Sequence, residues 1–389
     1  DVAGHPRLLR RPRRVNRLMR PFQKNKTNAF FALLSLPSTA MGFALSIQIS
    51  ALSWILTTRY NLDIHDVGLV WAAGPLAGIL GQVIIGVVSD RVWFWNGRRR
   101  PFILIGGVLA TLMLLALPNL DIVSAGLGVG GILGVAIAVA LTLDLAINVS
   151  FNPTRAIIAD VTTQGDERTK GYTWMQSISG TFGVLAYAVG ALWGNYVLIY
   201  GGAVIVLLFS ILPPLFIAEP RELAAEESPA GASVARKQDS LFGILLAIRP
   251  LWAFLAYDVY AMGRRLAGIQ PDSYYAEIAC GVVTVALVVQ ALLEKENGNG
   301  LAAFRKVIAA HSFSWVGIQT TFVFLFAFLQ QRMPQLSDLD MGRVGSTSFL
   351  VLNAVGAALP ALLLMPIALR VGRVKTHAGC LAFMTAGYV

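Results

Sequence analysis

The sequence predicts an all-α integral membrane protein whose helices cross the bilayer in two sets. Hydrophobic residues make up 56% of the 389 residues and charged residues only 13%, about half the charged share of soluble domains. The apolar residues are gathered in runs of about twenty or more, the length that a helix needs to cross the hydrocarbon core. Basic segments lie beside these runs. Such a chain has too little polar surface for a soluble fold.

Six apolar segments predict the first set of membrane helices. They are expected at 29–57, 67–88, 102–118, 122–158, 172–193 and 197–217. The connections at 59–66, 119–121 and 194–196 carry little positive charge, whereas the connection at 89–101 is strongly basic. Positive charge marks the cytoplasmic side of a membrane. We therefore expect a multi-pass protein of the cell membrane, inner or plasma, with a cytoplasmic amino terminus.

The rest of the chain predicts a linker and the start of a second set. Apolar segments at 307–330 and 346–369, and one from Ala378, resume the spanning pattern. Between the sets lie a polar stretch and two apolar segments, 241–262 and 276–293. Whether this insert spans stays open, because Arg264 and Arg265 would then lie outside. The expected domains are a basic cytoplasmic arm (1–28), a six-helix half (29–218), a cytoplasmic linker with the insert (219–303) and an incomplete second half (304–389).

The positive charge favours a lipid partner. The net charge is +10, and nine Lys or Arg fall between Arg7 and Lys26, next to the first apolar segment. This placement favours contact with anionic lipid head groups over nucleic acid.

Cys280 and Cys380 lie in apolar surroundings, and no Cys/His cluster exists. We expect no metal, no cofactor and no enzyme activity, and we expect a monomer.

Glycines between residues 126 and 134 form a pattern with two interpretations. Gly126, Gly128 and Gly131 match the spacing of a dinucleotide-binding turn, which requires a strand before it and a helix after it. Here the pattern lies inside an apolar run. Gly126, Gly130 and Gly134 recur every fourth residue, which favours close packing between membrane helices instead.

A polar stripe follows the fourth predicted helix. Asp144 and Arg155 are eleven residues apart, so both lie on one helix face about 16 Å apart. Asn148 and Asn152 lie between them on the same face. An ionisable group inside the membrane is costly and usually faces a cavity or a partner. The stripe predicts either a polar network between helices or a cavity wall with a titratable carboxylate and a cationic donor.

Charged residues are also concentrated in the turn "SDRVWFWNGRRRPF". Asp90 and Arg91 end one predicted helix, and Arg98–Arg100 precede Pro101, which suits the first turn of the next. The cluster is at least a cytoplasmic topology signal. A further hypothesis is a conformational latch that pairs with a carboxylate or a helix end across the cytoplasmic face.

Two sequence blocks resemble a known family. The first block contains Trp71, Gly74, Pro75, Gly78, Gln82, Gly86, Ser89-Asp90-Arg91 and Gly97-Arg98-Arg99-Arg100-Pro101-Phe102-Ile103. The second contains Asp144, Asn148, Pro153, Arg155, Ala156 and Asp160, and Arg168 extends it. Together they resemble the sucrose:proton symporters and their bacterial relatives. These belong to the glycoside–pentoside–hexuronide:cation symporters of the major facilitator superfamily. Asn152 departs from the glycine common in the plant members.

The resemblance implies a major facilitator fold of two six-helix halves, the second truncated in this chain. It also implies proton-coupled import of a sucrose- or maltose-like glycoside by alternating access. Asp144 would carry the proton and Arg155 would bind sugar hydroxyls. The gating motif would comprise Asp90, Arg91, Gly97, Arg98, Arg99, Arg100, Asp160 and Arg168.

Further residues are candidates for the wall of a sugar site. Sugars need aromatic rings for their apolar faces and paired donors and acceptors for their hydroxyls. Besides Asn148 and Asn152, the candidates are Gln48, Trp54, Trp174, Gln176, Trp315 and Gln319. The alternatives that stay open are a sodium-coupled or melibiose-type symporter, an exporter, and a membrane sugar receptor that does not transport.

Overall fold

The computed structural model describes residues 21–128, 130–220, 243, 246–269, 273–295 and 300–388. Every regular element in these ranges is a helix, which confirms the predicted all-α class. Eight helical stretches of the described residues are long and apolar enough to cross a membrane. Most of the basic arm predicted at 1–28 lies outside the described residues.

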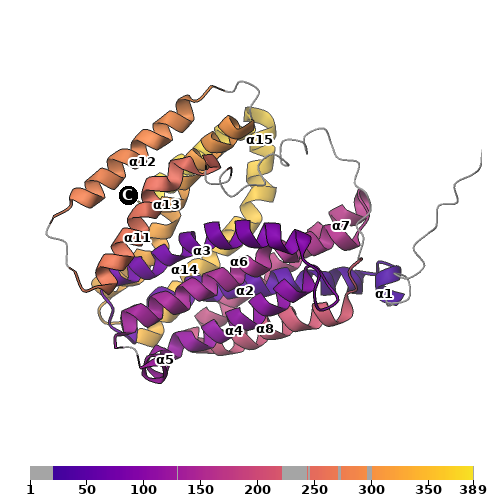
Figure 1. Cartoon of the computed structure of the whole chain (residues 1–389), viewed down its shortest axis with the longest axis horizontal. Coiled ribbons are helices and arrows are strands. Elements are labelled where there is room, and N and C mark those ends of the chain that lie inside the picture. Colours follow the sequence, from indigo (N-terminus) through magenta and orange to yellow (C-terminus); the bar gives the residue numbers. More distant parts are fainter. Residues whose placement is uncertain are drawn as a thin grey trace, which may run out of the picture.

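Six long helices form the first bundle (Figure 1). They are α2 (Asn28–Thr58), α3 (Ile64–Arg91), α4 (Arg100–Ala116), α6 (Ile132–Val161), α7 (Asp166–Trp193) and α8 (Asn195–Phe216), preceded by a short α1 (Pro21–Lys24). Helix α2 is the centre of the bundle, because it contacts α3, α4, α6, α7 and α8. Its side chains Ile47 and Trp54 are fully buried. Residues on α2 can therefore reach several helices at once.

The bundle has two distinct ends. We call the end with the turn between α3 and α4 the basic end, because Arg98–Arg100 lie there, and the other the opposite end. At the opposite end Asp63 caps α3 by accepting the backbone N–H groups of His65 and Asp66 at 2.8 and 2.9 Å. Only Gly194, with φ of 89°, separates α7 from α8 there. A positive φ suits glycine and permits this sharp reversal.

The glycine-rich stretch after α4 is a break between helices. The predicted connection at 119–121 and the helix predicted from 122 were wrong. A 3₁₀ turn (Leu117–Asn119) leads into a short α5 (Leu120–Leu127), and α6 begins only at Ile132. Gly128 and Gly131 have φ of 63° and 108°, conformations that a continuing helix cannot contain.

The prediction of close helix packing was wrong at two of the three glycines. A Cβ atom added at Gly126 or Gly130 would meet nothing within 4 Å, whereas one at Gly134 would lie 3.6 Å from Leu266 Cδ2. Gly126 and Gly130 are therefore not points where helices approach closely, and Gly134 makes an ordinary van der Waals contact.

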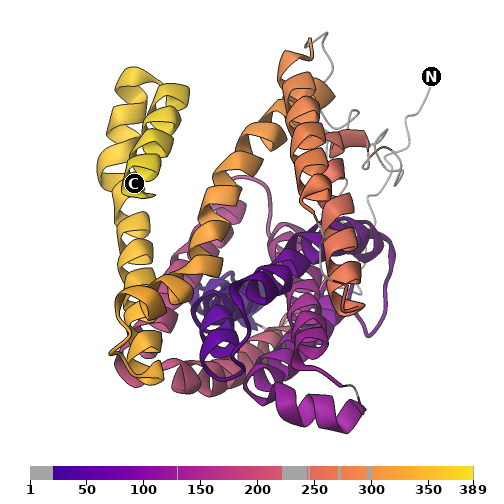
Figure 2. The same ribbon diagram turned by 90° about the vertical axis from the view of Figure 1, so that its left-hand side faces the viewer.

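The second set of helices is attached at the opposite end. It comprises α13 (Gly300–Arg332), α14 (Asp338–Leu359), a π turn (Pro360–Leu364), α15 (Met365–Val371) and α16 (Arg373–Tyr388). Figure 2 shows α13 and α14–α16 as two separate arms on the first bundle. Among the described residues, Trp54 Nε1 donates to the carbonyl of Asp338 at 2.7 Å, and the Ser50 and Ser346 hydroxyls lie 2.6 Å apart. Both contacts lie in the half of α2 that ends at the opposite end.

The insert between the sets forms two helices. Helix α11 (Trp252–Leu266) packs on α3, and α12 (Tyr275–Leu293) packs on α11 and α13. Of the two, only α12 is long and apolar enough to cross a membrane by itself. Arg265 on α11 pairs with Asp66 at 2.7 Å and Asp63 at 2.9 Å. The two carboxylates offset the positive charge that made a spanning insert unfavourable in the sequence.

Candidate functional site

Asp144 is joined to the central helix by one side-chain hydrogen bond. Gln48 Nε2 on α2 donates to Asp144 Oδ2 on α6 at 3.0 Å. Asp144 is half-buried and Gln48 is fully buried. The structure therefore places Gln48, predicted as part of a sugar wall, directly on the carboxylate.

Helix α3 also lies close to the Asp144 carboxylate, in addition to α2 and α6. A Cβ atom added at Gly74 would lie 3.1 Å from Asp144 Oδ2, and one at Gly78 would lie 3.8 Å from Asn148 Nδ2. The absence of a side chain at Gly74 lets α3 approach α6 at the level of Asp144. Helices α2, α3 and α6 thus surround one carboxylate.

The remaining stripe residues lie on α6 as predicted. Asn148 Nδ2 donates to the backbone carbonyl of Asp144 at 2.8 Å, and Asn152 is half-buried one turn further on. The Arg155 side chain is exposed, and its guanidinium carbon lies 4.7 Å from the centre of the Phe151 ring. Phe151 was not predicted for the site. An exposed guanidinium stacked on a ring offers both a planar set of donors and an apolar face.

The structure disperses the aromatic wall candidates. Trp54 is fully buried and bonded to Asp338, and Trp174 packs beside a second buried cluster around Phe30 and Phe31. Trp315 on α13 is exposed and donates to His311 Nε2 at 2.6 Å.

The two glutamine candidates differ in burial. Gln176 on α7 is exposed. Gln319 on α13 is half-buried, and its buried Oε1 finds no hydrogen-bond partner among the described residues. No described contact joins either glutamine to Asp144, so both stay predictions.

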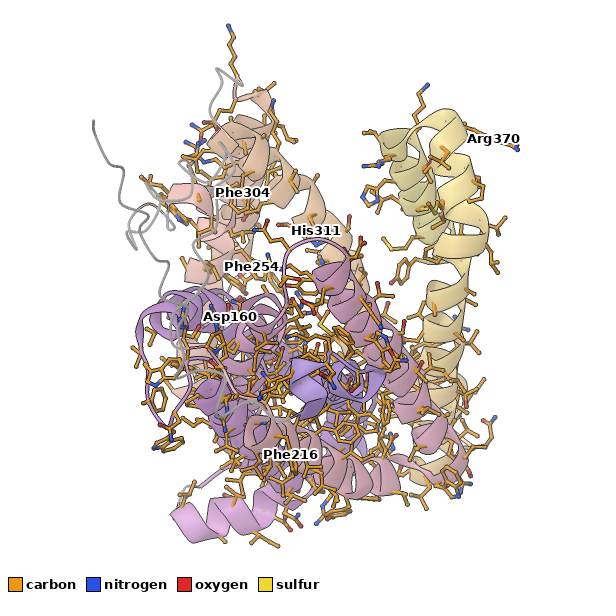
Figure 3. All side chains as sticks on the ribbon, turned by 90° about the vertical axis from the view of Figure 1, so that its right-hand side faces the viewer. Asp160, Phe216, Phe254, Phe304, His311 and Arg370 are labelled. Atoms are coloured by element: carbon orange, nitrogen blue, oxygen red, sulfur yellow. The ribbon has the colours of Figure 1, made fainter. Side chains whose placement is uncertain are left out.

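A second cluster lies at the basic end. Arg99 is buried; its Nε donates to Asp160 Oδ2 at 3.1 Å and its Nη1 to Ser89 Oγ at 2.9 Å. One guanidinium thereby joins the ends of α3 and α6 to the start of α4. Figure 3 looks onto this end of the molecule and labels Asp160. Arg168 Nη2 donates to the carbonyl of Ala159 at 3.1 Å.

Glu219, which follows α8, was missed by the sequence analysis. Its carboxylate accepts the backbone N–H groups of Arg98, Arg99 and Arg100 at 2.7, 2.9 and 2.7 Å. These groups begin α4, and a helix start attracts negative charge. A Cβ atom at Gly97 would lie only 2.9 Å from Glu219 Oε1, which accounts for the glycine. Its place as the first acidic residue after the sixth span was the available signal.

The described contacts of the basic-end cluster stay within the first bundle and the segment after α8. The side chains of Asp90 and Arg91, also predicted for the gating motif, lie outside the described residues. The conformational latch therefore stays a prediction. In the described residues, no group of three or more His, Cys, Asp or Glu could hold a metal ion.

Comparison with known proteins decides the family. Residues 34–389 match the Major Facilitator Superfamily. The chain belongs to this superfamily. It is therefore a multi-pass membrane protein of a transporter family and not an enzyme, as the sequence predicted.

Individual relatives transport sugars according to their names. The chain is 31% identical over 176 residues to the general alpha-glucoside permease of Schizosaccharomyces pombe, covering 41% of this chain and 32% of that protein. It is 26% identical over 312 residues to the sucrose transport protein SUC4 of Arabidopsis thaliana, covering 66% and 59%. It is 32% identical over 129 residues to the human proton-associated sugar transporter A, covering 32% and 17%. These matches confirm the resemblance to sugar symporters, although each spans less than two thirds of its relative.

Proposed function

We propose that the protein moves a glycoside together with a proton by alternating access. The observation that carries the proposal is the Asp144 carboxylate between α2, α3 and α6, bonded to Gln48. The other carboxylates of the membrane-candidate helices lie within three residues of a helix end. A carboxylate placed among apolar helices is a typical carrier for a proton.

The donor set around Asp144 favours a proton over sodium. Its described side-chain partner is the Gln48 amide, which can offer at most one oxygen to a cation. A hard metal cation prefers several oxygen ligands. One carboxylate and one amide suit a proton better.

The proposed sugar site lies along α6 toward Arg155. Asn148, Asn152 and Arg155 follow Asp144 on one face, and Phe151 lies against Arg155. The guanidinium offers fixed donors for hydroxyl pairs, and the ring offers an apolar surface for a sugar face. The names of the relatives, which mention sucrose and alpha-glucosides, favour a sucrose- or maltose-like disaccharide.

The arrangement of the two sets supports alternating access. The described contacts between them lie at the opposite end, whereas the first bundle is held together separately at its basic end by Arg99 and Glu219. We assign the basic end to the cytoplasm because positive charge lies there. The conformation described here is then closed toward the outside.

Uptake into proteoliposomes tests the proposal. Labelled sucrose and maltose are offered under an imposed pH gradient, with and without sodium. We expect accumulation that needs the pH gradient and not sodium. Accumulation driven by sodium alone would indicate a sodium-coupled symporter. Release of sugar down its gradient would indicate a sugar exporter, and sugar binding without transport would indicate a receptor. Each of these results would overturn the proposal.

A further inference from the structure

Gln48 offers one used and one unused hydrogen-bonding atom at the same place. Its Nε2 donates to Asp144 Oδ2 at 3.0 Å. Its Oε1 is buried and has no hydrogen-bond partner among the described residues, and only 1% of the residue is exposed. A buried acceptor without a partner is costly and calls for an explanation.

The chemistry of the Gln48 and Asp144 side chains explains the unpaired acceptor. An ionised carboxylate only accepts hydrogen bonds, and a protonated carboxyl group carries an O–H that donates. A glutamine amide can serve both forms, because a half-turn of its end group exchanges the N–H donor for the carbonyl acceptor. The unused Oε1 is the atom that the protonated carboxyl group requires.

We propose that Gln48 is a positioning residue for Asp144 whose amide turns over when the carboxyl group gains or loses its proton. This inference rests on the proposed function, in which Asp144 carries the proton. Gln48 then acts on the coupling ion rather than on the sugar. It holds the carboxyl group in one orientation through both protonation states.

Few other ionisable groups compete for this role. Helix α2 has none, α3 and α4 have them only at their ends, and α5 has only Asp121. Helix α7 adds charged residues over its first five positions, Tyr172 and Tyr187, and α8 adds Tyr196 and Tyr200 near its start. Helices α13 and α14 also pack on α2, and their ionisable groups are Arg305, Lys306, His311, Arg332, Asp338, Asp340 and Arg343. On α6 itself the nearest is Arg155, three turns away. Over the middle of these helices, Gln48 is the described side-chain partner of the carboxylate.

The position of Gln48 on α2 gives the turnover a mechanical consequence. Ser50, two residues further on, lies 2.6 Å from Ser346 on α14, and Ser53 Oγ donates to the carbonyl of Phe322 on α13 at 2.6 Å. The segment of α2 that contacts the proton site therefore also contacts the second set of helices. A change at Gln48 acts within two turns of that contact.

A double-mutant cycle tests the inference. Gln48→Met keeps the length of the side chain and removes both hydrogen-bonding atoms. Two rates are measured in proteoliposomes: accumulation driven by a pH gradient, and sugar-for-sugar exchange, which needs no net proton movement. We expect Gln48→Met to lower accumulation about tenfold, as for one charge-assisted hydrogen bond, and to change exchange by less than about twofold.

The Asp144→Asn background separates positioning from general structure. There Gln48→Met should not change sugar-for-sugar exchange, the rate that remains measurable once the proton site is gone. Equal losses of exchange and accumulation in the Gln48→Met single variant, or an added loss of exchange in the Asp144→Asn background, would overturn the inference. Ser35→Ala is the matched control: Ser35 is buried on the same helix, and its hydroxyl bonds to its own helix at Phe31.

An isosteric exchange of the pair provides a second variant if Gln48→Met does not reach the membrane. Gln48→Glu with Asp144→Asn keeps the total number of side-chain atoms and moves the carboxyl group from α6 to α2. Accumulation recovered relative to Asp144→Asn alone supports the inference, and no recovery overturns it. Absence of proton-driven accumulation in the unaltered protein would instead refute the proposed function, and the inference with it.

Discussion

At the residue scale, Arg155 carries a prediction about sugar binding. Lysine keeps the charge and loses the planar set of donors and the stacking on Phe151. We expect Arg155→Lys to raise the half-saturating sugar concentration about tenfold, the loss of roughly one charged hydrogen bond. Initial uptake rates over a range of sugar concentrations measure this. Unchanged kinetics would assign Arg155 to structure alone.

The stripe on α6 was predictable from the sequence, and its partners were not. Asp144, Asn148 and Arg155 lie on one segment, so the helical period alone places them on one face. Gln48 is 96 residues from Asp144, and Glu219 is 121 residues from Arg98. Such contacts depend on how helices pack, which no local pattern encodes. The aromatic candidates lie apart from one another for the same reason.

At the element scale, helix existence followed from the apolar runs, and helix boundaries followed from glycines and caps. The helix predicted from 122 to 158 fails because Gly128 and Gly131 adopt positive φ, which divides one apolar run into α5 and α6. The apolar character of both pieces hides this break from hydropathy. Asp63 caps α3, which begins at Ile64, and such a residue marks a helix start in a sequence. The prediction of a helix from 67 missed this signal, because it rests on the apolar run alone.

The start of α4 carries an element-scale prediction. Glu219→Gln removes the charge that three backbone N–H groups surround, which should lower the free energy of unfolding by about 1–3 kcal/mol. Thermal unfolding of the detergent-purified protein measures the loss. Arg98→Gln is the control, because the described bond of Arg98 to Glu219 comes from its backbone. Equal melting temperatures of Glu219→Gln and the unaltered protein would contradict the assignment.

The contact between α11 and α3 leads to a second prediction at the element scale. Arg265 bonds to both Asp63 and Asp66, so we expect Arg265→Gln to loosen the insert at the opposite end and lower the melting temperature. Asp63 is largely exposed, so its share is small, and Asp66→Asn should cost more than Asp63→Asn. Protease accessibility of the segment between α11 and α12 should rise with Arg265→Gln. Equal accessibility in variant and unaltered protein would mean that the ion pairs do not hold the insert.

At the scale of the whole molecule, two contact regions support the proposed mechanism. The two sets of helices meet at the opposite end, where Trp54 bonds to Asp338 and Ser50 to Ser346. The cluster of Arg99, Asp160 and Glu219 holds the first bundle together at the basic end. In alternating access, the contacts between the two sets of helices must break, while the first bundle, held by the basic-end cluster, moves as a unit. Asp144 lies between the two contact regions, on α6, which runs from one end to the other.

The Asp144→Asn variant tests the central claim most directly. Asparagine has nearly the same shape and cannot carry a proton. Two measurements are made on the same proteoliposomes: sugar accumulation driven by a pH gradient, and sugar-for-sugar exchange without one. The account predicts that accumulation is lost while exchange remains measurable. Intact proton-driven accumulation in Asp144→Asn, or loss of accumulation and exchange together in a correctly inserted protein, would contradict it.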